Sequence, residues 1–310
     1  MDEIVNDYHL VQPFQNQDSG FSRWTYGTKN GCTFFLKEFL DPIYPVDPGL
    51  EPAMRNSRIA DCKAYEEKKI HLYQTINLLS DGNLVRIVEF FRHHSHYYIS
   101  TPMISAESLT FDQIAALPFE DIILLCKTAA HSLMQLHEAK IVHSDIKDKN
   151  LLVKQTQTGK LVAKIIDFDC SFFEHQPPVS EDELGGDQIY LAPEACLFIC
   201  GEPVSLTCKM DVFSLGLLFH QYMTGTLPGF DTAEYFYAHE AVLDGNPLTV
   251  SSDLPDSIRL MLQQMLDADP EQRCTMRQVF QILDAFGNIC REPAASPAHP
   301  RDFFHVAGDL

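Results

Sequence analysis

Two short segments near the middle of the chain carry the residue types that phosphoryl transfer needs. They are Ile141-Val142-His143-Ser144-Asp145-Ile146-Lys147-Asp148-Lys149-Asn150-Leu151-Leu152-Val153 and Lys164-Ile165-Ile166-Asp167-Phe168-Asp169. The pattern places carboxylates, an ammonium and an amide on loops at the ends of short strands. In phosphoryl transfer a metal bridges phosphate oxygens, a carboxylate orients the attacking hydroxyl, and a cation offsets charge on the transferred group. Either segment alone could be a solvated loop, but the two at this spacing favour phosphoryl transfer.

These segments and three later ones resemble the protein kinase family, in the family's own order. His143 to Asn150 is similar to its catalytic loop H-R-D-x-K-x-x-N, and Asp167-Phe168-Asp169 to its D-F-G. Tyr190-Leu191-Ala192-Pro193-Glu194 resembles the A-P-E that ends the activation segment, and Asp211-Val212-Phe213-Ser214-Leu215-Gly216 the D-x-W-x-x-G helix. Arg273 matches the arginine that pairs with the A-P-E glutamate. The resemblance covers about residues 8–290.

The resemblance implies ATP and Mg²⁺ as cofactors and a role for each matching residue. Asp145 would accept or orient the substrate hydroxyl, and Lys147 would meet the γ-phosphate. Asn150 and Asp167 would hold Mg²⁺, and Lys37 aligns with the strand lysine that pairs the α- and β-phosphates. The resemblance implies that the remaining nucleotide contacts come from Ser19, Gly20, Phe21, Ser22, Thr101, Met103 and Leu152.

The helix glutamate expected to pair with Lys37 is Glu66 or Glu67. We choose Glu66 because Ile70 and Tyr73 follow it at four and seven residues, which predicts an inward apolar stripe on that face. The same positions after Glu67 hold polar residues. The resemblance further implies a buried column from Ile70 through Ile87 and Phe168 to His143, tied below to Asp211, which would make His143 structural.

The nucleotide-binding half departs from the family's pattern. Gln17, Ser19 and Ser22 stand at the three glycine positions of the phosphate loop, and Trp24 stands at its valine. Glycines there let backbone N–H groups approach the phosphates, so serine side chains would weaken nucleotide binding or substitute hydroxyl donors. Phe35 replaces the small alanine that faces adenine, where an edge or stacking contact is an alternative to a poor fit.

The activation segment also departs from the pattern. Ser144 replaces the arginine that clamps a phosphorylated loop, and residues 167–194 contain several extra acids and no Lys or Arg. We therefore expect activity without loop phosphorylation and a preference for hydroxyls flanked by basic residues; a loop whose acids merely aid solubility is the alternative. Asp169, in place of the last D-F-G glycine, would help to attract metal or would cap the next turn.

Two other functions remain alternatives to a protein Ser/Thr kinase. Small-molecule phosphotransferases of the aminoglycoside and choline kinase type share H-x-D, N and I-D-F-x, but they lack the A-P-E segment and the D-x-W-x-x-G helix. Lys147, two residues after Asp145, is typical of Ser/Thr-directed protein kinases. A pseudokinase scaffold is favoured by the eroded phosphate loop, whereas Lys37, Asp145, Asn150 and Asp167 argue against it. Nucleotide binding without turnover would distinguish it.

The elements that must position these residues form two lobes. Asn30-Gly31 is a hairpin signal before the aromatic run 33–39, and four prolines make 41–52 a loop. We predict a helix from Ser57 to Leu79, strands over 84–91 and 96–100, and then a mainly helical part. Its helices are predicted at 119–139, 210–224, 257–266 and 276–286, with short strands at 151–153 and 163–166 between the first two.

The fold class is therefore α+β, a two-lobed protein kinase-like fold. We assign residues 1–103 to a β-rich N-lobe, 104–291 to a helical C-lobe and 292–310 to a tail.

Composition excludes several classes of partner. The chain of 310 residues has 23 Lys+Arg against 43 Asp+Glu, a net charge of −20, so binding to nucleic acid through phosphate neutralisation is not expected. No apolar run approaches the roughly 20 residues that span a bilayer, and the acidic start MDEIVNDYHL is unlike a signal peptide. Nine cysteines without a C-x-x-C predict reduced thiols. We expect a cytoplasmic protein without membrane or nucleic-acid partners.

Overall fold

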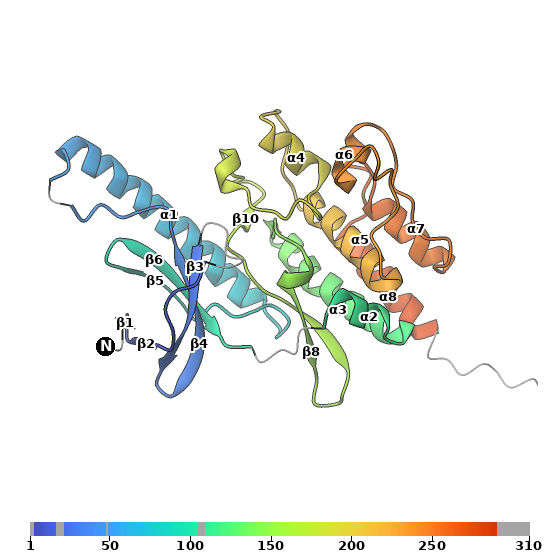
Figure 1. The fold of residues 1–310 in the computed structure, drawn as a ribbon, viewed down its shortest axis with the longest axis horizontal. Coiled ribbons are helices and arrows are strands. Elements are labelled where there is room, and N and C mark those ends of the chain that lie inside the picture. Colours follow the sequence, from blue (N-terminus) through green and yellow to red (C-terminus); the bar gives the residue numbers. More distant parts are fainter. Residues whose placement is uncertain (1–2, 17–21, 48, 105–108, 290–310) are drawn as a thin grey trace, which may run out of the picture.

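The computed structural model describes residues 3–16, 22–47, 49–104 and 109–289 and has the expected two-lobed architecture (Figure 1). One lobe consists of a sheet with the long helix α1 across one of its faces, and the other is mainly helical (Figure 1). The expected tail at 292–310 lies outside the described residues. The domain limits at 103 and 291 stay predictions.

A six-stranded antiparallel sheet forms the core of the first lobe, in the order β1-β2-β3-β4-β6-β5. Its strands are Ile4–Val5, Tyr8–Leu10, Ser22–Lys29, Cys32–Phe39, Glu89–His93 and His96–Pro102, for β1 to β6 respectively. Asn30 (φ 52°) and Gly31 (φ 76°) turn β3 into β4, which confirms the predicted hairpin. Lys37 thereby lies in a strand flanked on both sides, opposite Trp24 on β3 and Ile99 on β6.

Helix α1 (Pro52–Leu79) begins five residues before the predicted start. Pro52 occupies its first turn, where the missing N–H costs no hydrogen bond, and the Glu51 carboxylate caps the N–H of Met54 at 3.0 Å. The last proline of the predicted loop is therefore the first residue of the helix. Its buried residues are Cys62, Lys69, Leu72, Tyr73 and Ile76. Ile70 is 42% exposed, so its predicted place in the buried column is wrong.

The second lobe is built around α3 (Phe119–Glu138) and α5 (Lys209–Thr224). α5 is buried along Met210–Met223, because several other helices pack around it. The structure confirms the four predicted helices within a few residues. The other helices are α2 (Phe111–Ala115), α4 (Pro193–Ile199), α6 (Ala238–Leu243), α7 (Asp256–Met265) and α8 (Met276–Ile289), of which α2, α4 and α6 were not predicted.

Short elements between α3 and α4 carry the chemistry-bearing segments. β8 (Leu151–Gln155) pairs with β9 (Leu161–Ile165), and β7 (Ile141–Val142) pairs with β10 (Phe172–Phe173). Two 3-10 turns, η1 (Asp148–Asn150) and η2 (Glu181–Glu183), complete this region. The N–H of Val85 donates to the carbonyl of Ile165 at 2.8 Å, which attaches the first lobe directly beside Asp167.

No helix within the described residues is long and apolar enough to cross a bilayer. The eight described cysteines form no disulfide with one another.

Candidate active site

The catalytic-loop wall of the cleft, residues 143–150, holds its polar side chains in mutual contact. Lys147 Nζ donates to Asp145 Oδ2 at 2.8 Å, and Asn150 Nδ2 donates to the same oxygen at 2.9 Å. Asn150 Nδ2 also donates to the backbone oxygen of Asp145 at 2.8 Å. Within the described residues the other carboxylate oxygen, Oδ1, is buried and has no hydrogen-bond partner. Such an atom is costly unless a ligand satisfies it, so it marks where a donor would bind.

Asp211 anchors this loop from below. Its carboxylate accepts hydrogen bonds from the N–H groups of His143 at 2.7 Å and Ser144 at 2.8 Å. His143 is buried, its Nε2 donates to the Ile166 carbonyl at 3.1 Å, and its ring meets the Phe168 ring edge-on at 5.2 Å. Ile87 and Phe168 are buried as well; the Phe168 to His143 contact and the Asp211 tie of the predicted column are confirmed, whereas Ile70 lies outside it. His143 is therefore a structural residue, as predicted.

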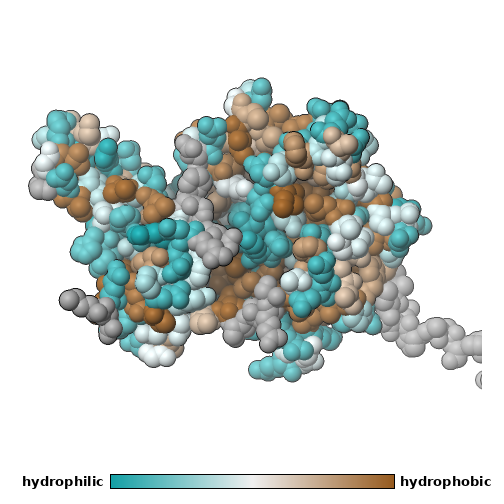
Figure 2. Space-filling view, viewed as in Figure 1, coloured by the Kyte–Doolittle hydropathy of each residue, from teal (hydrophilic) through white to brown (hydrophobic). Residues whose placement is uncertain are grey.

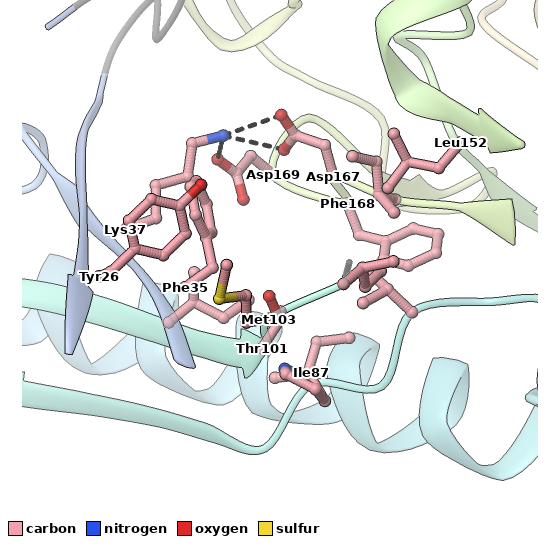
Figure 3. A pocket seen from close by; sticks show the side chains of 15 residues that line it. Tyr26, Phe35, Lys37, Ile87, Thr101, Met103, Leu152, Asp167, Phe168 and Asp169 are labelled. Atoms are coloured by element: carbon pink, nitrogen blue, oxygen red, sulfur yellow. Dashed lines mark hydrogen bonds and ion pairs between the residues drawn. The ribbon is translucent and has the colours of Figure 1, made fainter. Parts of the chain in front are cut away.

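Lys37 meets two carboxylates on the opposite side of the cleft (Figure 3). Its Nζ lies 2.9 Å from Asp167 Oδ2 and 2.5 Å from Asp169 Oδ2. Burial by itself would lower the pKa of Lys37, but the charges of Asp169 and Asp167 outweigh it and raise the pKa. Burial opposes ionisation of Asp167, yet Lys37 holds its pKa below the usual value. Burial and the neighbouring Asp167 charge raise the pKa of Asp169 to about 6.

Glu66 is placed differently from our expectation. Its Oε1 accepts a hydrogen bond from the Tyr97 hydroxyl at 2.7 Å and lies 3.8 Å from Arg92 Nε. Lys37 has ion pairs only with Asp167 and Asp169 in the described part of the chain. The predicted Lys37 to Glu66 pair is therefore corrected: Asp169 holds the position beside Lys37, and α1 turns Glu66 towards β5 and β6.

Lys69 on α1 belongs to the site, although the sequence did not single it out. It is buried, and its Nζ donates to the backbone oxygen of Asp169 at 2.5 Å. The only signal in the sequence is its spacing, four residues after Tyr65 and four before Tyr73, which predicts one helix face. A lysine normally lies on the solvent side of a helix, so this spacing alone does not predict a buried ammonium.

A cavity of about 240 Å³ adjoins the Lys37 cluster (Figure 3). Thr101, Met103 and Leu152 line it, at the places where the sequence predicts nucleotide contacts. Phe35 and Tyr26 form its other side, and the Trp24 ring stacks on Phe35 at 5.7 Å. Aromatic rings thus replace a small aliphatic surface. In the space-filling view the surface is hollowed between the lobes, with hydrophobic residues visible inside (Figure 2).

The phosphate-loop residues Ser19, Gly20 and Phe21 lie outside the described residues. Ser22 is buried at the first position of β3 and does not line this cavity, so nothing in the described structure places it at a nucleotide.

The polar groups of the cleft fit Mg²⁺. Asn150 is the last residue of η1, and Asp167 lies two residues after β9. The Ile166 N–H donates to the Asn150 carbonyl at 3.0 Å, which fixes Asn150 beside the residue that precedes Asp167. The described residues contain no cluster of three or more Asp, Glu, His or Cys that could enclose a metal. Mg²⁺ usually takes one or two carboxylates and completes its shell with phosphate oxygens and water, which suits this sparse donor set.

The activation segment is tied into the helical lobe at its end. Arg273 donates to Glu194 through two hydrogen bonds of 2.6 and 2.9 Å, and both side chains are buried. The Tyr190 hydroxyl donates to Gln221 at 2.6 Å. Glu174 accepts from the Cys208 N–H and lies 3.2 Å from Lys140 Nζ, so this acid serves the fold. Glu181 and Glu183 on η2 are exposed.

Known proteins resemble the chain along most of its length. The family model described as the protein kinase domain matches residues 53–283. The dual specificity protein kinase shkC of Dictyostelium discoideum is 27% identical over 208 residues, which cover 66% of this chain and 39% of that protein. The serine/threonine-protein kinase PSK2 of Saccharomyces cerevisiae is 24% identical over 220 residues, which cover 69% of this chain and 18% of that protein.

A third relative is shorter in its match but higher in identity. The mitogen-activated protein kinase kinase kinase 13-A of Xenopus laevis is 32% identical over 155 residues, covering 50% of this chain and 15% of that protein. The matched part is thus less than half of each of these three relatives. Together with the two lobes and the motif geometry, the family match over residues 53–283 shows that the chain belongs to the protein kinase domain family.

Proposed function

We propose that the chain is an ATP- and Mg²⁺-dependent protein kinase that transfers the γ-phosphate to Ser or Thr of protein substrates. The observation that carries the proposal is the state of Asp145. Lys147 and Asn150 hold one carboxylate oxygen, and the other is buried without a partner among the described residues. A substrate hydroxyl would satisfy that oxygen and would be oriented for attack by it. The three relatives described above are named as protein kinases.

Each remaining residue has a role that its contacts support. Asn150 and Asp167 would hold Mg²⁺, which neutralises phosphate charge when bound. Lys147, now on Asp145, would turn to the γ-phosphate, and Lys37 would bind the α- and β-phosphates. Thr101, Met103 and Leu152 would enclose the base. We place the boundary between the two lobes near residue 103.

The ordered C-terminal end of the activation segment favours protein substrates over small molecules. The buried Arg273 to Glu194 pair and the Tyr190 to Gln221 bond fix a platform beside Asp145. Small-molecule phosphotransferases lack this segment. The exposed acids Glu181 and Glu183 would attract basic residues near the target hydroxyl. Ser144 offers no cation for a loop phosphate, so we propose that phosphorylation of this loop is not needed for activity.

A nucleotide-binding scaffold is the second candidate. It would be a pseudokinase without phosphate transfer, and the cavity of about 240 Å³ walled by Phe35 and Tyr26 favours it only because such a cavity, smaller than the ~300–1,000 Å³ of most ligand pockets, would hold ATP poorly.

One assay separates these functions. The full chain is incubated with γ-labelled ATP, Mg²⁺, a basic carrier protein and, in parallel, an aminoglycoside or choline, and labelled amino acids and small molecules are identified, the former after acid hydrolysis. We expect phosphoserine and phosphothreonine from the wild type and none from Asp145→Asn. ATP binding without label transfer would identify a scaffold, and label on small molecules alone would identify the rival phosphotransferase.

A further inference from the structure

The charges around Lys37 are exchanged relative to the family's pattern. That pattern has a glutamate on the helix and a glycine at the third D-F-G position. Here the third position is Asp169, and the inward position of α1 is the buried Lys69. We propose that Asp169 is the residue that positions Lys37, and that Lys69 in turn positions Asp169. The proposal rests on the proposed role of Lys37 at the phosphates.

Asp169 is the lasting partner of Lys37 because Asp167 has another role. Lys37 Nζ lies 2.5 Å from Asp169 and 2.9 Å from Asp167. A metal on Asp167 would compete with Lys37 for the two Asp167 oxygens that Lys37 now contacts. Glu66 does not replace it, because its carboxylate bonds the Tyr97 hydroxyl at 2.7 Å. Asp169 is then the carboxylate that still holds the extended Lys37 side chain when the Asp167 oxygens turn to the metal.

Lys69 holds the Asp169 segment from behind. Its ammonium donates to the Asp169 backbone oxygen at 2.5 Å and lies over the rings of Tyr65 at 5.9 Å and Tyr73 at 5.7 Å. A buried ammonium is tolerated only where oxygens and aromatic faces replace its water. The helix therefore offers a cation at the place where the family has an anion. Lys37 pairs with both carboxylates, and the Lys69 charge behind the Asp169 backbone adds to the stabilisation of the ionised Asp169, although burial lowers the pKa of Lys69 itself.

The two exchanged positions should depend on each other. With Lys69 present, a carboxylate at 169 completes a balanced set of two cations and two anions. With a glutamate at 69, a carboxylate at 169 would add a third anion beside Lys37, next to Asp167. The chemistry thus predicts that a glutamate at 69 works only when residue 169 is glycine.

The test compares single and paired variants of the full chain. Steady-state kcat and KM for ATP are measured with a protein substrate, and the dissociation constant of mant-ADP is measured with Mg²⁺. We expect Asp169→Asn to lower kcat/KM about 100-fold, the usual loss for a preorganised charged group. Lys69→Met should lower it about tenfold, through kcat, with mant-ADP affinity changed less than about threefold. Glu66→Gln should lower kcat/KM less than Lys69→Met does.

The decisive measurement is on the double variant Lys69→Glu with Asp169→Gly, which restores the family's arrangement of charges. Lys69→Glu alone should be at least as damaging as Asp169→Gly alone. Combined with Asp169→Gly it should recover kcat/KM about tenfold above the product of the two single effects. Glu67→Gln, an exposed neighbour of Glu66, is the matched control and should match the wild type. Circular dichroism melting confirms that each variant is folded.

Several results would overturn the proposal. One is a kcat/KM of the paired variant that equals the product of the two single effects. Another is a larger loss of kcat/KM in Glu66→Gln than in Asp169→Asn. The third is a kcat/KM of Asp169→Asn equal to that of the wild type. If the paired variant does not fold, the ranking of Asp169→Asn, Lys69→Met and Glu66→Gln still decides. Failure of the proposed function is seen separately, because a chain that transfers no phosphate can still bind mant-ADP. In that case Asp169→Asn must weaken this binding, or the proposal fails.

Discussion

The catalytic-loop wall keeps the family's polar side chains in mutual contact, whereas the opposite wall does not. We call the latter the sheet wall, formed by β3, β4 and α1. On the catalytic-loop wall, Asp145, Lys147 and Asn150 are hydrogen-bonded and Asp211 anchors the backbone. On the sheet wall, aromatic rings line the cavity and Lys37 pairs with Asp169.

The difference shows which residues of a phosphoryl-transfer site can be replaced by other residues and which cannot. The catalytic-loop residues act on reacting atoms, so their types and spacing are fixed by chemistry. The sheet wall only has to present one ammonium and enclose one base. A carboxylate from another position can hold the ammonium, and rings can replace aliphatic side chains.

The largest expected effect is on the stability of the catalytic-loop wall's lobe. Arg273→Met leaves the buried Glu194 carboxylate without its partner, which should lower the free energy of unfolding by about 3–5 kcal/mol. Urea unfolding measures it. Arg277→Met, which breaks an exposed pair with Glu138, is the control and should cost less than about 1 kcal/mol. Equal losses would show that burial of the Arg273 pair has no special weight.

The next largest effect is on transfer itself. Asp145→Asn and Asp167→Asn should each lower the transfer rate more than ~100-fold, because each removes a charge at the reacting groups. Their melting temperatures should stay close to wild type, since neither side chain belongs to the apolar core. Asp148→Asn, on the same loop, is the matched control. Near-wild-type transfer by either variant would mean that the active site is misassigned.

A smaller effect should appear at the aromatic side of the cavity. Phe35→Ala should widen it and raise kcat/KM for a bulky N6-substituted ATP about tenfold relative to ATP. Phe34→Ala, whose side chain instead packs against Tyr8 at 5.4 Å, is the control and should leave this ratio unchanged. The same ratio in both variants would contradict a base-binding role for the Phe35 ring.

The smallest effect concerns substrate choice. Glu181→Gln with Glu183→Gln should reduce the preference for basic over neutral peptides about threefold at low salt, and the difference should vanish near ~0.5 M salt. The double variant Glu120→Gln and Glu271→Gln removes two exposed charges elsewhere and should preserve the preference. A preference for acidic peptides in the wild type would refute the electrostatic account.

Most of the fold could be predicted from local patterns. Asn30-Gly31 demands the positive φ of a tight hairpin turn, and the regular apolar spacing of α3, α5, α7 and α8 indicated their ends within a few residues. The three helices that were not predicted have five to seven residues, too few for a periodic signal.

The catalytic-loop wall was predictable and the sheet wall was not. Asp145 to Asn150 are five residues apart, so their geometry is largely local. The pairing of Lys37 joins β4, α1 and the segment after β9, which no local pattern specifies. The inward face of α1 contains Lys69, while Ile70 is 42% exposed, so an apolar stripe gives the wrong rotation of the helix. The choice of Glu66 followed from that rotation.

A crystal structure with Mg²⁺ and a non-hydrolysable ATP analogue tests the difference between the two walls most directly. We predict the metal on Asn150 and Asp167, and Lys37 on Asp169 and the phosphates, with Lys69 still bonded to the Asp169 backbone. A structure in which α1 has rotated to pair Glu66 with Lys37, with Asp169 turned away, would contradict this account.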